Sequence, residues 1–155
     1  AEVPDAEFHI FYGLEPLDKN GKEELAAAIR NETQIPSVIY HGGVPDAELY
    51  EWYQHCSVFA FPCKNFDETL SSATLKAMAL GCYPVVNQTG CLPEVTAVCG
   101  GLAIPDEQYA HELIQTLKQP IPASVRVQMA ETARRQFSRD VMVIKMLRVI
   151  EGVQC

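Results

Sequence analysis

The stretch DETLSSATLKAMALGCYPVV, from Asp67 to Val86, decides the fold of this chain. Its pattern is typical of an acidic loop, a helix of small residues that begins at Ser71–Ser72, a glycine stop at Gly81 and a short buried strand. The run SVFAFPC (57–63) lies just before it and is almost continuously apolar, as expected for a strand that is covered on both faces. A strand, a helix and a second strand in this order predict two parallel strands joined by a crossover helix.

The same alternation of strands and helices continues along the chain. We expect strands within residues 7–13, 35–43, 57–63, 83–87 and 102–104, and helices within 19–32, 45–56, 71–80, 107–118, 123–137 and 139–152. Asp106 and Ser138 are the expected caps of the helices that follow them, and no helix is predicted between the last two strands. This order predicts an α/β fold with a Rossmann-like doubly wound parallel sheet, in a single domain that comprises residues 1–155.

Composition excludes several classes of function. The 155 residues include 20 Asp and Glu against 12 Lys and Arg, which gives a net charge of −8 and no basic stripe for a nucleic acid. No apolar run is as long as a bilayer span, and the first residues carry no export signal. The six cysteines form no Cys-x-x-Cys pair, so we interpret them as buried, reduced thiols of a cytoplasmic protein. The four histidines show no metal-ligand spacing and are interpreted as structural.

The helix start after the acidic loop has the features of an anion site. Backbone N–H groups near Leu70, Ser71, Ser72 and Ala73 have no partner within the helix, and two hydroxyls lie beside them. These groups favour a phosphate or diphosphate, whereas Glu68 is suited to accept hydrogen bonds from sugar hydroxyls or to face a developing positive charge. Together they suit a nucleotide sugar. The alternative is that Glu68 is a solvated loop acid and that the serines only cap the helix.

The order of short motifs resembles that of one enzyme family. The pieces are Phe61-Pro62, Glu68, Ala-Met-Ala at 77–79, Gly81, Pro-Val-Val at 84–86, Gly-Cys-Leu-Pro-Glu at 90–94, Gly101-Leu102 and Pro105. This sequence of pieces is similar to that in the C-terminal, nucleotide-sugar-binding domain of the group 1 retaining glycosyltransferases with the GT-B fold (family four). The resemblance extends over nearly the whole chain.

The resemblance implies roles for the matched positions. Glu68 takes the catalytic position near the reacting carbon of the donor sugar, and the backbone of Thr69, Leu70, Ser71 and Ser72 holds the sugar and the diphosphate. The family normally needs no metal, and the sequence has no Asp-x-Asp metal motif. We therefore expect no cofactor, with the nucleotide sugar as substrate.

Lys76 and the pair Gly42–Gly43 each allow two interpretations. Lys76 stands where the family has a second Glu, which accepts hydrogen bonds from the ribose hydroxyls, whereas lysine only donates. The loss of the two ribose hydrogen bonds costs roughly 1–3 kcal/mol of binding free energy if nothing compensates. Lys76 either binds a phosphate instead or is a tolerated surface residue, and the two alternatives are equally well supported. Gly42 and Gly43 either let the nucleotide approach the backbone, with Gly43 as a contact, or simply end a strand.

The start of the sequence departs from the family pattern as well. The Gly-Arg strand end and Lys-Gly helix start that open the family's C-terminal half are not found, so we expect a sheet without its first strand. That strand is central in the order 3-2-1-4-5-6. The last helix is apolar around most of its circumference, which predicts that it packs against further protein surface.

Two functions follow from these observations. The first is the donor-binding half of a retaining glycosyltransferase, whose acceptor sugar, lipid or protein is bound by an N-terminal domain that this sequence lacks; peripheral membrane association of the full enzyme is compatible with it. The second is a degenerate, non-catalytic domain that serves as an interaction or scaffold module.

Overall fold

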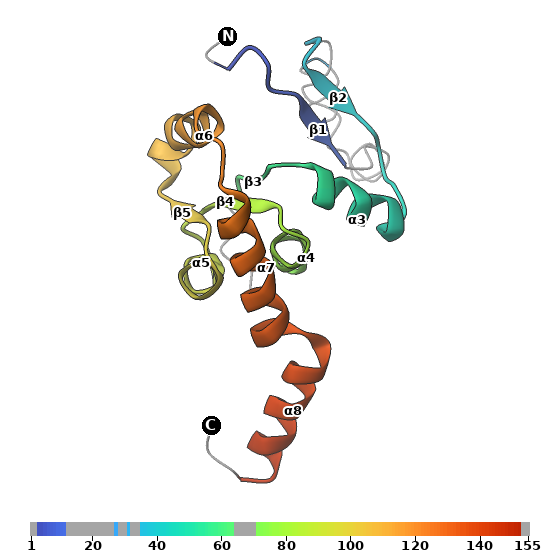
Figure 1. Ribbon diagram of the computed structural model, residues 1–155, viewed down its shortest axis with the longest axis vertical. Coiled ribbons are helices and arrows are strands. Elements are labelled where there is room, and N and C mark those ends of the chain that lie inside the picture. Colours follow the sequence, from blue (N-terminus) through green and yellow to red (C-terminus); the bar gives the residue numbers. More distant parts are fainter. Residues whose placement is uncertain (1–2, 12–26, 28–30, 32–34, 64–70, 153–155) are drawn as a thin grey trace. The chain divides into compact units, whose positions relative to one another are not determined.

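The computed structural model describes residues 3–11, 27, 31, 35–63 and 71–152 (Figure 1). Its elements are β1 (Phe8–Ile10), β2 (Val38–Tyr40), α3 (Asp46–His55), β3 (Val58–Phe61), α4 (Ser72–Ala79), β4 (Tyr83–Asn87), α5 (Leu92–Cys99), β5 (Leu102–Ile104), the 3₁₀ turn η1 (Asp106–Gln108), α6 (Tyr109–Lys118), α7 (Ala123–Phe137) and α8 (Arg139–Ile150). The helix predicted within 19–32 falls almost entirely outside the described residues.

The chain divides into two compact units, Ala1–Glu51 and Trp52–Cys155. The single domain expected from the sequence therefore stays a prediction. None of the helices in the described residues combines the length and the apolar character that a membrane-crossing segment requires.

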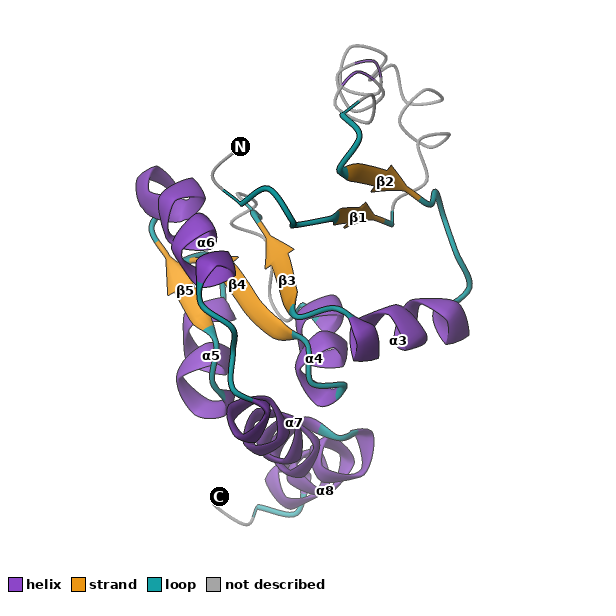
Figure 2. Ribbon diagram, turned by 45° about the horizontal axis from the view of Figure 1, so that its top comes forward, coloured by secondary structure: helices purple, strands orange, loops and turns teal. Residues whose placement is uncertain are grey.

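All described strand pairs are parallel, as the sequence predicts. In the N-terminal unit β1 pairs with β2, and in the C-terminal unit β3, β4 and β5 form a sheet in that order (Figure 2). An order of 3-2-1-4-5-6 pairs its second strand with its third and joins its fourth, fifth and sixth strands, which are the pairings found here. The α/β fold class with parallel sheets and crossover helices is confirmed.

Strand β4 is the centre of the C-terminal unit. Val85 and Val86 are both 0% exposed, and because neighbouring residues of a strand point to opposite faces, β4 is covered on both sides. Val85 packs in one cluster with Ile104 and Tyr109 of β5 and α6. A second cluster joins α4, α5 and α7 through Met78, Val95, Cys99, Met129 and Ala133. Burial on both faces therefore holds for β4, whereas β3, for which the sequence predicts it, is only half-buried and exposes Ala60.

The prediction that no helix separates the last two strands is wrong. Helix α5 runs from Leu92 to Cys99 and carries the crossover that a parallel β4–β5 pair requires. Its sequence, LPEVTAVC, is short and rich in β-branched residues, so its helix propensity is low. Packing compensates, because its Leu92, Val95 and Cys99 are buried, and the Thr96 hydroxyl donates a hydrogen bond to the Leu92 carbonyl.

One of the two predicted helix caps is also wrong. Asp106 begins the 3₁₀ turn that precedes α6, and α6 itself follows Gln108, which makes no side-chain cap. The Asp106 carboxylate instead accepts a hydrogen bond from Asn87. Ser138 is confirmed as a cap, because its hydroxyl accepts from the backbone N–H of Val141 at the start of α8.

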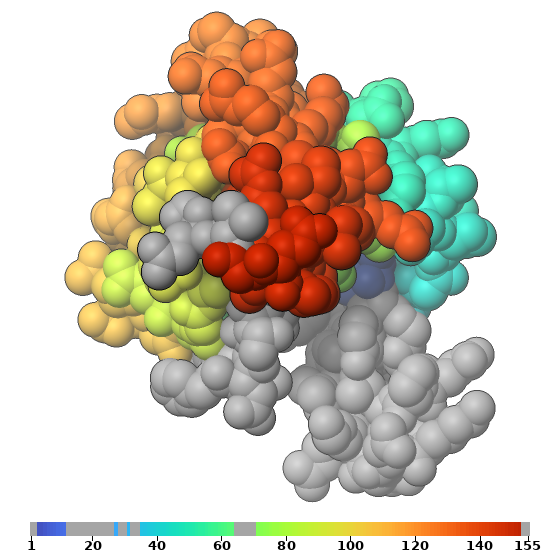
Figure 3. Space-filling view, turned by 90° about the horizontal axis from the view of Figure 1, so that it is seen from below, coloured from blue at the N-terminus to red at the C-terminus, as the bar shows by residue number. Residues whose placement is uncertain are grey.

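Helix α8 exposes most of its apolar side chains. The exposed apolar side chains range from 38% at Met142 to 76% at Ile150, and α8 lies at the surface in the space-filling view (Figure 3, red). Helix α7 is the element of the described chain that packs most against α8. The apolar surface that the sequence predicts for this helix is therefore left largely uncovered by the described residues.

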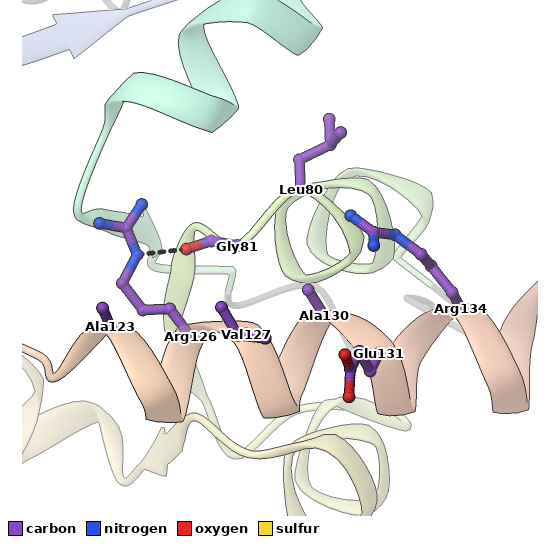
Figure 4. A pocket seen from close by; sticks show the side chains of 8 residues that line it. All are labelled: Leu80, Gly81, Ala123, Arg126, Val127, Ala130, Glu131 and Arg134. Carbon is purple, nitrogen blue, oxygen red and sulfur yellow. Dashed lines mark hydrogen bonds between the residues drawn. The ribbon is translucent and has the colours of Figure 1, made fainter.

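Arg126 fixes α7 to the turn before β4. Its guanidinium donates to the Gly81 carbonyl at 2.6 Å and to the Cys56 carbonyl at 3.1 Å, and Figure 4 shows the first of these bonds. Beside it lies an open cavity of about 290 Å³, lined by Leu80 and Gly81 and by Arg126, Glu131 and other residues of α7. Because Gly81 precedes β4, this cavity lies at the amino edge of the sheet.

Arg126→Met is expected to lower the free energy of unfolding by about 2–4 kcal/mol, because two charge-assisted hydrogen bonds are lost and the carbonyls keep no partner of equal strength. Urea denaturation measures this change. The matched control is Arg135→Met, at an exposed position of the same helix, which is expected to change stability by no more than about 0.5 kcal/mol. Equal losses in the two variants would show that Arg126 does not fix α7.

A second stability prediction concerns Gly101, between α5 and β5. Gly101 has φ +118°, and a Cβ there would lie 2.5 Å from Pro84 Cγ of β4. Gly101→Ala is therefore expected to cost about 2–5 kcal/mol, from backbone strain and the clash together. Gly81→Ala shares the positive φ but meets nothing within 4 Å, so it is expected to cost only about 1–2 kcal/mol in the same denaturation experiment. A loss at Gly101 no larger than that at Gly81 contradicts the close approach to Pro84.

Candidate functional site

The carboxyl edge of the β3–β4–β5 sheet is where a ligand is expected in this class of fold. Three connections leave this edge: the chain after Phe61, the turn from Asn87 to the start of α5, and the turn from Pro105 into η1. Helices α4 and α5 both begin here, because each carries the chain from the end of one parallel strand to the start of the next. Two helix N-termini, with their partial positive charge, thus lie at one edge of the sheet.

The structure describes only part of the predicted site. Glu68, Thr69 and Leu70 lie outside the described residues, so their predicted roles are not tested. Ser71, Ser72 and Lys76 are placed together on α4. Gly43 belongs to the N-terminal unit, where it is exposed after the end of β2.

The two serines at the start of α4 differ in what their hydroxyls can do. Ser71 is the N-cap and only 4% exposed, and its Oγ accepts from the Thr74 backbone N–H at 3.3 Å and from the Thr74 hydroxyl at 2.9 Å. Ser72 is the first helical residue, and its side chain is exposed. The backbone N–H groups of Ser72 and Ala73 lie in the first turn, where the helix provides no acceptor for them. Ser71 therefore shapes the site, and the Ser72 hydroxyl is positioned to contact a ligand.

Lys76 lies on the same face of α4 as Ser72. The two residues are four positions apart, which places them one above the other, about 6 Å apart along the helix axis. Side chains of a helix lean toward its N-terminus, so the half-buried Lys76 side chain leans toward the turn that carries Ser72. This arrangement brings a cation to the side of the helix that offers a free hydroxyl.

Sequence reasoning did not single out a buried polar pair at the same edge of the sheet. Asn87, the last residue of β4, is 1% exposed, and its Nδ2 donates to Asp106 Oδ1 at 2.5 Å. Asn87 Oδ1 is buried, and none of the described residues provides it with a hydrogen-bond partner. The signal in the sequence is a polar residue at the end of the apolar run YPVVN. The pair fixes the turn after β5 to the end of β4, and with it the start of η1.

Glu94 lies in the first turn of α5, where a negative charge is favourable at the positive end of the helix. The structure therefore places Glu94 as a helix-start residue.

Burial reduces the reactivity of three cysteine thiols in the C-terminal unit. It raises the pKa of the Cys82 thiol to about 12, with the neighbouring Cys56 adding to the effect, and it raises the pKa of Cys56 and Cys99 as well. These thiols stay protonated near neutral pH and are poor nucleophiles. In the part of the chain that the structure describes, His, Cys, Asp and Glu side chains form no group of three that could hold a metal ion.

Comparison with known proteins agrees with this architecture. A family model described as glycosyl transferases group 1 matches residues 2–136. The crystal structure of the C-terminal domain of a glycosyl transferase group 1 family protein, LpcC from Francisella tularensis, matches with a TM-score of 0.51 and 22% sequence identity. The match covers 84% of this chain and 65% of that one, so this chain spans less than two thirds of its structural relative. A search of curated proteins found no match.

The structural likeness concerns the fold, which is that of a GT-B C-terminal, Rossmann-like domain. The family model covers most of the sequence, including β3, α4 and β4, on which the motifs of the predicted site lie. This chain belongs to the group 1 glycosyl transferase family.

Proposed function

We propose that this chain is the donor-binding half of a retaining glycosyltransferase, which transfers a sugar from a nucleotide-diphosphate sugar to an acceptor. The observation that carries the proposal is the start of α4 at the carboxyl edge of the sheet, where Ser71 is buried as the cap and Ser72 is exposed. A helix N-terminus that presents N–H groups and a hydroxyl suits the oxygens of a diphosphate.

In this proposal, different residues bind different parts of the donor. The Ser72 hydroxyl and the N–H groups of Ser72 and Ala73 donate to the diphosphate, while Lys76 contributes a positive charge from the same face of the helix. Glu68 accepts hydrogen bonds from the sugar and stabilises the positive charge that develops at its reacting carbon. Gly43 stays a predicted contact of the nucleotide. Lys76 and the helix start offset part of the diphosphate charge, and we propose that no metal ion is needed.

The other parts of the proposal concern the whole enzyme. We propose that a further domain binds the acceptor, whether sugar, lipid or protein, and that the enzyme works in the cytoplasm. All five cysteines in the described part of the chain are free thiols, which is typical of a reducing compartment.

The alternative function is a non-catalytic domain that serves as an interaction or scaffold module. Lys76 favours it, because a lysine cannot accept the hydrogen bonds of a ribose diol. In this alternative the start of α4 is only a capped helix, and no nucleotide sugar binds.

The first test separates the two serines. Ser72→Ala is expected to weaken binding of UDP, GDP or ADP about tenfold or more, through the loss of a hydrogen bond to a charged phosphate, while the free energy of unfolding stays nearly unchanged. Ser71→Ala is expected to lower the free energy of unfolding by about 0.5–2 kcal/mol through the loss of the cap. Calorimetric titration and urea denaturation measure the two effects. If none of the three nucleotides binds wild-type protein at millimolar concentration, the proposed function is wrong.

The second test concerns Lys76 and decides between the two functions. If Lys76 pairs with a phosphate, Lys76→Met is expected to weaken nucleotide binding about fivefold, and Lys76→Glu is expected to weaken it further. Both effects are expected to shrink as salt is added, because salt screens the charge. If the lysine has only displaced a ribose acceptor, Lys76→Glu binds more tightly than wild type. Measurable affinity that is the same in all three proteins shows that Lys76 does not contact the nucleotide, and the absence of binding in all three supports the non-catalytic alternative.

A further inference from the structure

Two histidines that are 32 positions apart in the sequence meet in the N-terminal unit. His9 lies on β1 and His41 directly follows β2, and His9 Nδ1 lies 2.9 Å from His41 Nε2. The ring centroids are 5.2 Å apart with an angle of 19° between the ring planes. This separation equals the nitrogen–nitrogen distance plus roughly one ring radius on each side, so the two nitrogens face each other in line. The contact is therefore an N–H···N hydrogen bond between two nearly coplanar imidazoles.

The surroundings determine where protons can be added to this pair. The outer nitrogen of His9, Nε2, lies 3.6 Å from the Glu7 carboxylate. Whichever ring donates, the first added proton goes to the outer nitrogen of the donor ring, and the resulting imidazolium donates a stronger, charge-assisted bond to the other ring. The second proton must go to the facing nitrogen of the acceptor ring. Its addition removes the hydrogen bond and places the two positively charged rings edge to edge.

The pair lies where β1 and β2 end. Phe11, just after β1, stacks on the His41 ring with centroids 4.5 Å apart and 7° between the planes. The His41 backbone N–H donates to the Ile10 carbonyl at 2.9 Å. Gly42 follows at once with φ +76°, so the turn at Gly42–Gly43 begins where this contact ends.

We propose that the His9–His41 pair is a proton-sensitive clasp that sets the position of the Gly42–Gly43 turn. The clasp is closed with no added proton or with one, and it opens when both rings are protonated. The Glu7 carboxylate lies beside His9, and the hydroxyl of Tyr40 lies near Gly42. The open state binds two added protons and the closed state at most one, so a fall in pH favours the open state.

The consequence for nucleotide binding rests on the proposed function, in which Gly43 contacts the nucleotide. Opening of the clasp displaces the turn that carries Gly43. Nucleotide affinity is therefore expected to fall when the clasp opens. The conformational part of the proposal does not depend on that function, because the rings and the turn are observable without a ligand.

Nuclear magnetic resonance of the full chain tests the clasp directly. Ring nitrogen signals of His9 and His41 are followed from about pH 8 to pH 4, across the range in which imidazoles titrate. We expect both rings to respond to both protonation steps, with the Gly42 and Gly43 amide signals moving at the second step. Two independent single-site titrations, with the glycine signals unmoved, would overturn the proposal.

Hydrogen exchange of the His41 amide gives a second readout. Its protection, corrected for the intrinsic pH dependence, is expected to fall about tenfold or more at the second step, which corresponds to the loss of one hydrogen bond to a charged group. His9→Gln and His41→Gln keep hydrogen-bonding side chains but remove the coupling, so this step is expected to disappear in both. His111→Gln, at an exposed position of α6, is the matched control and keeps the step. Persistence of the step in His9→Gln contradicts the clasp.

A third measurement keeps the clasp and the proposed function distinguishable. Nucleotide affinity is measured by calorimetry above and below the second step. A two-step ring titration with no nucleotide binding at any pH leaves the clasp intact and rejects the proposed function. Nucleotide binding that does not change across the second step rejects the coupling between the clasp and Gly43.

Discussion

The burial of β4 on both faces is the constraint on which the rest of the C-terminal unit depends. Val85 and Val86 are fully buried, and a parallel strand in this position needs a crossover helix before it and another after it. Helices α4 and α5 supply those crossovers, and each must begin at the carboxyl edge of the sheet. The candidate site follows from this geometry, because two helix N-termini and the ends of three strands meet at one edge.

Local patterns in the sequence predict most helices and strands of this unit. They fail where packing or contacts between distant residues determine the structure. The apolar runs of β3 and β4 and the small residues of α4 indicate their structures directly. Helix α5 could not be recognised from propensity, because buried Leu92 and Val95 stabilise a segment whose β-branched residues favour a strand. The crossover rule does predict a helix there, so topology is the stronger signal at this point.

The candidate site shows the same limit. The sequence predicts that Ser71–Ser72 begins a helix, but it cannot tell which hydroxyl caps the helix, because that depends on the backbone angles at Ser71. Nor can it predict the Asn87–Asp106 hydrogen bond, which joins the ends of two strands across a complete crossover. The His9–His41 contact is equally non-local, and the sequence led to the interpretation of both rings as isolated structural residues.

The acidic composition of the chain does not oppose binding of a diphosphate at α4. The net charge of −8 is spread over the whole sequence, and at physiological ionic strength salt screens charges beyond about 8 Å. In the proposed function, the positive groups that a phosphate meets on the described part of α4 are its first turn and Lys76, which lies within two turns of it. The N–H groups of the first turn carry a partial charge and the ammonium carries a full one. On this proposal, Lys76 in place of the family's carboxylate removes an acceptor for the ribose and adds an attraction for the phosphates. The proposed lysine contact would thus weaken one part of a nucleotide's binding while it strengthens another.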